Sequence, residues 1–182
     1  MIRIAKQNNY ILPSVYQGNY SAVARLTETE LFPTLRKHNI AFYAYSPIAG
    51  GFLTKTPAQL IEGGQGRWDP SNFLGQLYNT LYKKPGMLKA LEMWGEIAKE
   101  IGVTKAELAY RWVAYNSQLK GELGDAMIIG ARTIDQLKET LVGLGNGPLS
   151  AKVAERIEEI WRIVEHESPL DNYNNYIALQ QK

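Results

Sequence analysis

The sequence of 182 residues contains no cysteine. Such a chain forms no disulfide, offers no thiol nucleophile and lacks the ligands of a cysteine-based zinc site. Its formal net charge is only +2, and its Lys and Arg residues are scattered, which gives no support to a nucleic-acid partner. Its apolar runs fall short of the ~20 residues of a membrane-spanning helix, and its first residues lack the apolar region of a signal peptide. We therefore expect a soluble, cytoplasmic protein whose partners are neither nucleic acids nor membranes.

Strand and helix patterns alternate along the chain. Short, nearly continuous apolar runs, typical of strands buried on both faces, predict strands at 10–16, 40–45 and 126–130. Apolar spacings and capping signals predict the end of a helix at 1–9 and helices at 28–38, 85–101, 104–116, 133–144 and 151–167. Thr-x-x-Glu/Gln boxes begin at Thr27, Thr104 and Thr133, as at helix N-termini. The polar stretch 55–84 is predicted to be a long loop.

This alternation predicts an α/β fold with a parallel sheet, and we interpret residues 1–182 as a single domain. Three strands are few for a parallel sheet of this kind. A (β/α)₈ barrel has eight strands and about 250 residues. The number of strands therefore indicates that the chain forms part of a larger fold.

Three stretches resemble the aldo-keto reductase superfamily, in particular its aflatoxin-aldehyde reductase branch. They are Leu12–Tyr20 with the following Arg25 and Glu28–Pro33, then Phe42–Thr54, and Asp125–Thr133 with Gln136 and Leu137. The resemblance implies a partial (β/α)₈ TIM barrel, namely its C-terminal portion, with three parallel strands (6, 7 and 8) and surrounding helices. It also implies that the family's catalytic Tyr, Lys, Asp and His belong to the part before these strands, so we predict no catalytic residue in this chain.

The resemblance implies NADP(H) as cofactor and assigns its nicotinamide to the ends of the first two strands. Gln17 would hydrogen-bond the carboxamide, and the ring of Tyr45 would stack on the nicotinamide. A glutamine in a turn and a core tyrosine are the alternatives. The cofactor-binding segment continues through Ser46, Pro47, Ile48, Ala49, Gly50 and Gly51. The two glycines allow backbone N–H groups to approach a pyrophosphate closely, although such a pair is also common in ordinary loops.

A second cofactor-binding segment lies where the third predicted strand runs into a capped helix, at Gly130, Ala131, Arg132 and Gln136. A helix N-terminus attracts anions through its free N–H groups and its dipole, and Arg132 adds a permanent cation. The resemblance implies that this segment holds the 2′-phosphate of NADPH; the alternative for Arg132 is an exposed surface residue. Thr140 departs from the branch, which commonly has an adenine-contacting Asn there.

Two further residues are candidates in the long polar stretch. Arg67 belongs to a Gly-Arg-aromatic step which, by the resemblance, closes over the cofactor. Tyr78 falls where the branch has a substrate-side tyrosine, and packing within the loop is its alternative. We interpret His38 and His166 as structural or solvated and predict no metal site.

The predicted activity is NADPH-dependent reduction of aldehydes or ketones, small-molecule carbonyl substrates, to alcohols, here in a chain that lacks the catalytic segment. One alternative is a non-catalytic NADP-binding or interaction module. Another is an inactive truncated product. The outer strands would then expose unpaired edges, which favours a homo-oligomer or a complementing chain.

Overall fold

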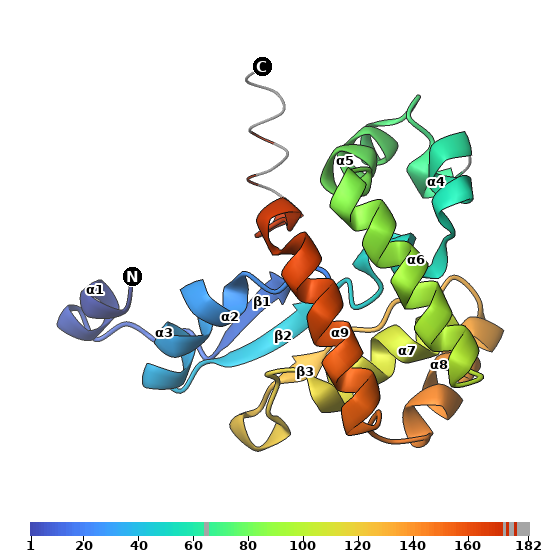
Figure 1. The fold of residues 1–182 in the computed structure, drawn as a ribbon. Coiled ribbons are helices and arrows are strands. Elements are labelled where there is room, and N and C mark those ends of the chain that lie inside the picture. Colours follow the sequence, from blue (N-terminus) through green and yellow to red (C-terminus); the bar gives the residue numbers. More distant parts are fainter. Residues whose placement is uncertain (64–65, 173, 175–176, 178–182) are drawn as a thin grey trace.

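The computed structural model describes residues 1–63, 66–172, 174 and 177. Its sheet has three parallel strands in the order β1 (Val15–Asn19), β2 (Ala41–Tyr45) and β3 (Ala126–Met127) (Figure 1). β1 and β2 pair along their whole length, whereas β3 adds two residue pairs. Within the described residues the sheet is open, as expected for part of a barrel.

Helices make up most of the remaining fold, and α6 and α9 lie side by side (Figure 1). Their bounds are α1 (Ile2–Gln7), α2 (Thr27–Glu30), α3 (Phe32–Lys37), α4 (Pro57–Glu62), α5 (Phe73–Tyr82), α6 (Pro85–Glu100), α7 (Lys105–Arg111), α8 (Ile134–Gly145) and α9 (Ala151–Val164). Short 3₁₀ segments lie at Ala49–Thr54, Gly66–Trp68, Gly121–Leu123 and Glu165–Glu167, and Trp112–Asn116 is π-helical. None of the described helices combines the length and the apolar character needed to cross a bilayer.

The core lies between one face of the sheet and the helices. Phe42 and Ala44 of β2 are fully buried, and the Phe42 ring packs edge-on against Phe32 of α3 at a centroid distance of 4.8 Å. Trp94 of α6 and Ile160 of α9 belong to the same buried cluster. One face of the sheet is therefore covered by helices.

Among the described residues, much of the opposite face of the sheet is uncovered, so the prediction of strands buried on both faces was wrong. Val15, Tyr43 and Ile128 are 42%, 36% and 37% exposed. The strand register and the alternation of side chains put these three residues on one face. Continuous apolar sequence indicates that a strand can be buried on both faces, but burial needs a second layer of structure.

Two predicted strands have different bounds in the structure. The first was predicted at 10–16 but begins at Val15, where pairing with Ala41 starts, and runs on to Asn19. Pro13 lacks the N–H that a strand ladder needs, and Ile11 before it is 98% exposed. The third strand has two residues instead of five, although Ile128 N still donates to Ala44 O at 2.8 Å.

The predicted helix 28–38 is two short helices, α2 and α3, and the capping box predicted at Thr27 does not form. Leu26 is the N-cap of α2, and Thr27 is a buried residue inside that helix. Pro33 sits in the first turn of α3, where its missing N–H costs no intrahelical bond. Proline at this position favours the start of α3 over the continuation of α2.

The stretch 55–84, predicted to be a loop, is largely helical. It contains α4, the 3₁₀ segment at Gly66–Trp68 and α5, while residues 64 and 65 lie outside the described part of the chain. Side chains of Trp68, Leu77 and Tyr82 join the core from this stretch. Its aromatic residues were the signal that it packs against the core.

The later helices agree with the sequence. Thr104, Thr133 and Ser150 cap α7, α8 and α9, each accepting a hydrogen bond from the backbone N–H three residues on. The predictions for β2 and α6 are confirmed within one residue at each end.

Candidate cofactor site

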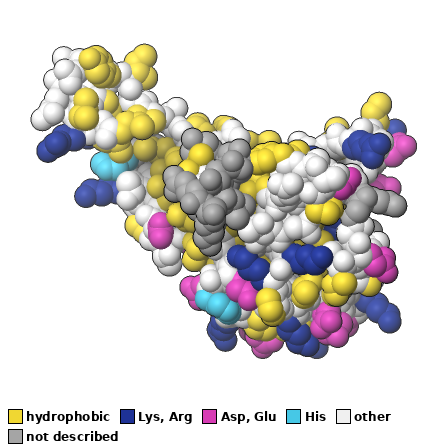
Figure 2. Space-filling model, turned by 90° about the horizontal axis from the view of Figure 1, so that it is seen from above, with side chains coloured by type: hydrophobic (Ala, Val, Ile, Leu, Met, Phe, Trp, Pro, Cys, Tyr) yellow, Lys and Arg dark blue, Asp and Glu magenta, His cyan; other side chains and the backbone are white. Residues whose placement is uncertain are grey.

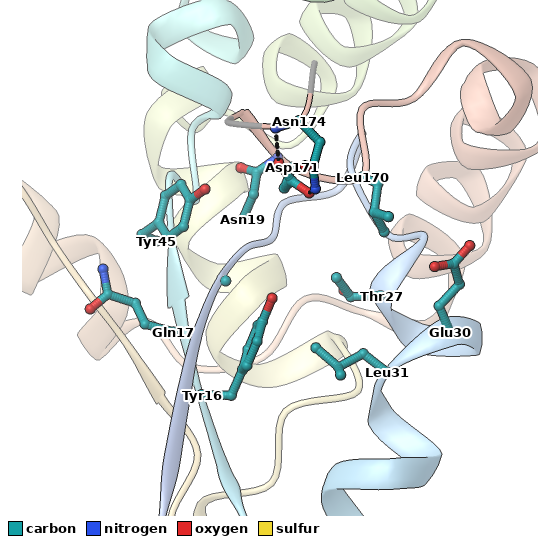
Figure 3. A pocket seen from close by; sticks show the side chains of 11 residues that line it. Tyr16, Gln17, Asn19, Thr27, Glu30, Leu31, Tyr45, Leu170, Asp171 and Asn174 are labelled. Carbon is teal, nitrogen blue, oxygen red and sulfur yellow. Dashed lines mark hydrogen bonds between the residues drawn. The ribbon is translucent and has the colours of Figure 1, made fainter. Parts of the chain in front are cut away.

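A cavity of about 480 Å³ lies at the carboxyl end of β1 (Figure 3). It brings together Gln17 of β1 and Tyr45 of β2, two residues predicted to bind the nicotinamide. Gln17 is exposed and Tyr45 is half-buried. Leu170, Asp171 and Asn174 come from the end of the chain and complete the lining together with Tyr16, Gly18, Asn19, Thr27, Glu30 and Leu31. Parallel strands thus place two predicted site residues at one edge.

Tyr45 is held as a neutral phenol in this cavity. Burial raises the pKa of its hydroxyl, and the negative charge of Asp171 raises it further. The side chain therefore offers a ring face and a hydroxyl group near neutral pH.

A second cavity, of about 530 Å³, lies between α7 and α8. Four predicted cofactor residues line it: Ile48 from the turn after β2, and Gly130, Ala131 and Gln136 from the segment after β3. The rest of its lining comes from Thr54, Thr104, Ala106, Glu107, Tyr110, Glu139, Thr140, Val142 and Gly143. Segments about 80 residues apart in the sequence thus meet around one space.

The N-terminus of α8 forms part of the wall of this cavity. Thr133 Oγ1 accepts a hydrogen bond from Gln136 N at 3.2 Å, and Gln136 Oε1 accepts one from Arg132 N at 3.0 Å. Arg132 itself is exposed and lies outside the residues that line the cavity. Its guanidinium is therefore available to an anion at the rim, whereas the Gln136 side chain is turned back onto the backbone.

The turn from Ser46 to Gly51 connects the two cavities and has an unusual backbone. Ser46, Ala49, Gly50 and Gly51 have positive φ angles of 59°, 51°, 65° and 94°. Left-handed conformations at non-glycine residues cost free energy and cluster at functional sites. Pro47 and Ala49 are buried, so the packing of these two residues holds the turn in place.

Gly50 packs against Tyr78, the residue predicted to lie on the substrate side. Tyr78 is 8% exposed, and its ring centroid lies 5.3 Å from that of Trp68. Trp68 Nε1 donates to Gly50 O at 3.2 Å, and the guanidinium of Arg67 lies 6.0 Å from the Tyr78 ring centroid. The candidates from stretch 55–84 therefore gather beneath the turn that carries the two glycines.

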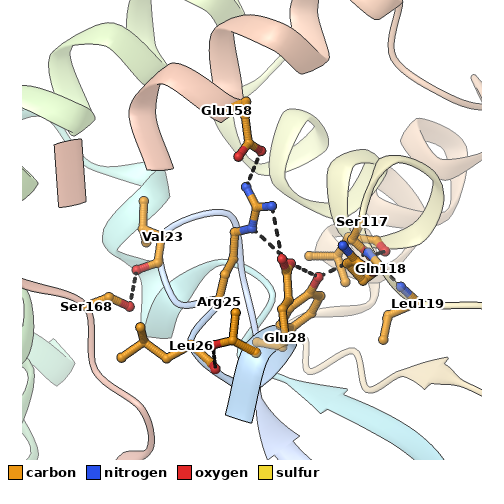
Figure 4. A network of polar contacts seen from close by, with 12 residues as sticks. Val23, Arg25, Leu26, Glu28, Ser117, Gln118, Leu119, Glu158 and Ser168 are labelled. Atoms are coloured by element: carbon orange, nitrogen blue, oxygen red, sulfur yellow. Dashed lines mark hydrogen bonds and ion pairs between the residues drawn. The ribbon is translucent and has the colours of Figure 1, made fainter. Parts of the chain in front are cut away.

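Arg25, part of the first family motif, centres a buried network that no local sequence pattern predicted (Figure 4). Its guanidinium donates to both carboxylate oxygens of Glu28 and, at 2.6 Å, to Glu158 of α9. The rings of Trp112 and Trp161 each lie 5.2 Å from it. The network ties the loop after β1 to α9.

The end of the chain is held near the first cavity by separate contacts. Ser168 Oγ donates to Val23 O at 3.1 Å, and the Glu167 carboxylate accepts from Gly86 N and Met87 N at the start of α6. These bonds place Leu170 and Asp171 beside Tyr45.

Asn19 and Asp171 line the first cavity but were not among the predicted site residues. Alternation along β1 puts Asn19 on the same face as Gln17, and this was the available signal. Nothing local marked Asp171, because its position depends on the distant contacts of residues 167 and 168. Among the described residues, no three His, Asp or Glu side chains gather as a metal-binding group.

The sequence profile described as "Aldo/keto reductase family" matches residues 1–162 of this chain. The chain belongs to this family. Its likeness to characterised members is substantial. It is 42% identical over 165 residues to the oxidoreductase sirO of Leptosphaeria maculans, which covers 91% of this chain and 50% of that protein.

Mammalian relatives include aflatoxin aldehyde reductases. The chain is 37% identical over 174 residues to aflatoxin B1 aldehyde reductase member 2 of Rattus norvegicus, which covers 91% of the chain and 47% of the relative. With aldo-keto reductase family 7 member A3 of Homo sapiens it shares 36% identity over 176 residues, covering 91% and 52%. The chain therefore spans about half the length of these aldo-keto reductases.

Proposed function

We propose that this chain is the NADP(H)-binding portion of an aldehyde or ketone reductase of the aflatoxin-aldehyde reductase branch, with its strands corresponding to the last three of the barrel. The main support is the turn from Ser46 to Gly51. Tyr45 just before it lines the first cavity, and Ile48 within it lines the second. A dinucleotide has two ends joined by a pyrophosphate, and two cavities joined by a glycine-containing turn suit that shape.

When bound, NADPH supplies a hydride from C4 of its nicotinamide to the carbonyl carbon of a substrate. This chain's residues orient the cofactor. The Gln17 amide hydrogen-bonds the carboxamide, and the Tyr45 ring covers one face of the nicotinamide. Positioning the reactive atom is the usual contribution of a protein to cofactor chemistry.

At the adenosine end of the cofactor, the N-terminus of α8 and Arg132 hold the 2′-phosphate. An exposed, permanently charged guanidinium next to a helix N-terminus favours a phosphate over the 2′-hydroxyl of NAD(H). Glu107 also lines this cavity, but its carboxylate is paired with Arg111 at 3.0 Å. This pairing reduces its repulsion of the phosphate.

Isothermal titration with NADP⁺ and NAD⁺ tests the proposal. We expect tighter binding of NADP⁺, and Arg132→Ala should remove most of that preference. Arg162→Ala, an exposed cation on α9, is the matched control and should leave it unchanged. Absence of binding by either nucleotide would refute the proposed function.

We also propose that the uncovered sheet face packs against the remaining strands of a barrel, supplied by another segment or chain. Val15 and Tyr43 lie on that face. Figure 2 shows further hydrophobic side chains on the projecting N-terminal part, where Tyr10 is 64% and Ile11 is 98% exposed. Large exposed apolar patches commonly mark interaction sites.

By this proposal the 182-residue chain alone reduces carbonyl substrates poorly. NADPH oxidation with 4-nitrobenzaldehyde measures this directly, and turnover at rates typical of enzymes would contradict it. Size-exclusion chromatography adds a second test. A clean monomer without cofactor-dependent change would argue against obligatory pairing with a second copy.

A further inference from the structure

We propose that Asn19 recognises the carboxamide group of the nicotinamide, as a second amide beside Gln17. This inference rests on the proposed function, because it concerns the same cofactor. It adds a residue for which the resemblance to the family assigned no role.

The position of Asn19 follows from the strand register. It is the last residue of β1, two residues after Gln17, and its partner on β2 is Tyr45. Side chains two residues apart in a strand share a face, and so do those of paired residues on neighbouring strands. Gln17, Asn19 and Tyr45 therefore line one side of the first cavity (Figure 3).

The Asn19 amide is buried without its full set of hydrogen bonds. Its residue is 1% exposed, and neither Nδ2 nor Oδ1 has a hydrogen-bond partner among the residues that the structure describes. The hydroxyl of Tyr82 is its polar neighbour: burial raises the pKa of Tyr82, and the Asn19 amide partly offsets this rise. A primary amide has two donors and an acceptor with two lone pairs, so even a weak contact with this one hydroxyl leaves most of them unsatisfied.

Buried polar groups in folded proteins are nearly always satisfied, so an amide that lacks partners in the wall of a cavity indicates a ligand with matching groups. A carboxamide matches it best, because its N–H₂ donates to Oδ1 while its carbonyl accepts from Nδ2.

The charges around the cavity favour the ring end of the cofactor over its phosphates. Glu30 and Asp171 contribute carboxylates to the lining, and none of its described residues is Lys or Arg. Such a lining repels phosphate and accommodates a neutral dihydropyridine or a cationic pyridinium.

The experiment compares NADP⁺ with its 3-acetylpyridine analogue, in which a methyl group replaces the carboxamide N–H₂. Both ligands are titrated into the full 182-residue chain, and again into Asn19→Leu and Asn8→Leu variants. Asn8 is exposed, far along the chain from the cavity lining, and hydrogen-bonds only Ile4 O among the contacts described. The preference for NADP⁺ is the Kd of the analogue divided by the Kd of NADP⁺. This ratio should be about three- to tenfold larger for the wild-type chain and the Asn8 control than for the Asn19 variant, the equivalent of one net hydrogen bond.

Leucine has the same number and branching of side-chain heavy atoms as asparagine and needs no hydrogen bond, so the variant should fold, which thermal melting checks. Asn19→Ser provides a second, smaller replacement and should show the same loss of preference. The fragment 2′,5′-ADP lacks the nicotinamide and should bind all of these proteins equally.

The outcomes separate the two proposals. An unchanged preference for NADP⁺ in both Asn19 variants would overturn the role of Asn19 and leave the proposed function standing. Weaker binding of 2′,5′-ADP to those variants would show a general structural effect, which also overturns it. Absence of NADP⁺ binding to the wild-type chain would overturn the proposed function and this inference together.

Discussion

Replacing Gly50 with alanine would drive a methyl group into the ring of Tyr78. A Cβ atom at Gly50 would lie 2.1 Å from Cε1 and 2.6 Å from Cζ of Tyr78. The ring has little room to withdraw, because it is 8% exposed and packs beside the rings of Trp68 and Tyr82. The backbone at Gly50 also has a φ of +65°, which L-residues rarely adopt.

Two effects determine the size of the loss. A left-handed backbone costs an alanine about 1 kcal/mol, and forcing a methyl group into a packed site costs about 2 kcal/mol. Gly51 separates them, since its φ is +94° but the nearest atom to its Cβ would be Trp68 Nε1 at 3.7 Å. Gly51→Ala therefore bears only the backbone strain, and Gly50→Ala should destabilise the chain by about 2 kcal/mol more.

Urea unfolding followed by tryptophan fluorescence measures both variants. Adding Tyr78→Leu to Gly50→Ala removes the ring that causes the clash, so the double variant should lose less stability than the two single changes predict, by about 1–2 kcal/mol. If Gly50→Ala cost no more than Gly51→Ala, or the double variant were simply additive, the packing of Gly50 on Tyr78 would be refuted.

Three other variants test the fold around the site, each by the free energy of unfolding. Arg25→Met should cost about 3 kcal/mol, because it leaves the partly buried Glu28 carboxylate without its cation. Lys89→Met in the exposed pair with Glu92 should cost almost nothing, and equal losses would contradict this. Thr133→Ala should cost about 1 kcal/mol through the lost cap of α8; no change would show that the cap is unimportant. Asp125→Asn should cost about 3 kcal/mol and flatten the acid limb of the stability curve.

The pH dependence of that last variant follows from the contacts of Asp125. Burial would raise the pKa of its carboxyl, but hydrogen bonds from Arg36, Phe42 N and Lys120 N, together with the Arg36 charge, lower it. Its stabilising contribution is therefore complete above the unfolded-state pKa of about 4 and disappears as the pH falls through the lower folded-state pKa. Stability that declines equally with acid in wild type and variant would exclude this role.

Several elements of the fold were predictable because their signals are local. The apolar spacing of α6 and the caps Thr104, Thr133 and Ser150 depend on residues within one or two helical turns. The apolar run of β2 is equally local. In contrast, Thr27 has the sequence of a cap but is buried inside α2, because the long-range contact of the neighbouring Arg25 with Glu158 sets the position of this segment.

The candidate site divides in the same way. Resemblance to the family named Gln17 and Tyr45, and the structure brings them to one cavity, but it leaves Arg132 at a rim outside the second cavity. Asn19 went unnoticed because burial without hydrogen bonds has no counterpart in a sequence.

The sequence by itself determined where β2, α6 and the capped helices α7, α8 and α9 form and to which family the motifs belong, since propensity, capping and spacing act over a few residues. Only the tertiary structure decided that one face of the sheet is covered and that, among the described residues, much of the other is open. It also decided that Gly50 lies under Tyr78 and that Asp171 faces Tyr45. These features arise from contacts between segments many residues apart, and burial, charge and steric fit are set by such contacts.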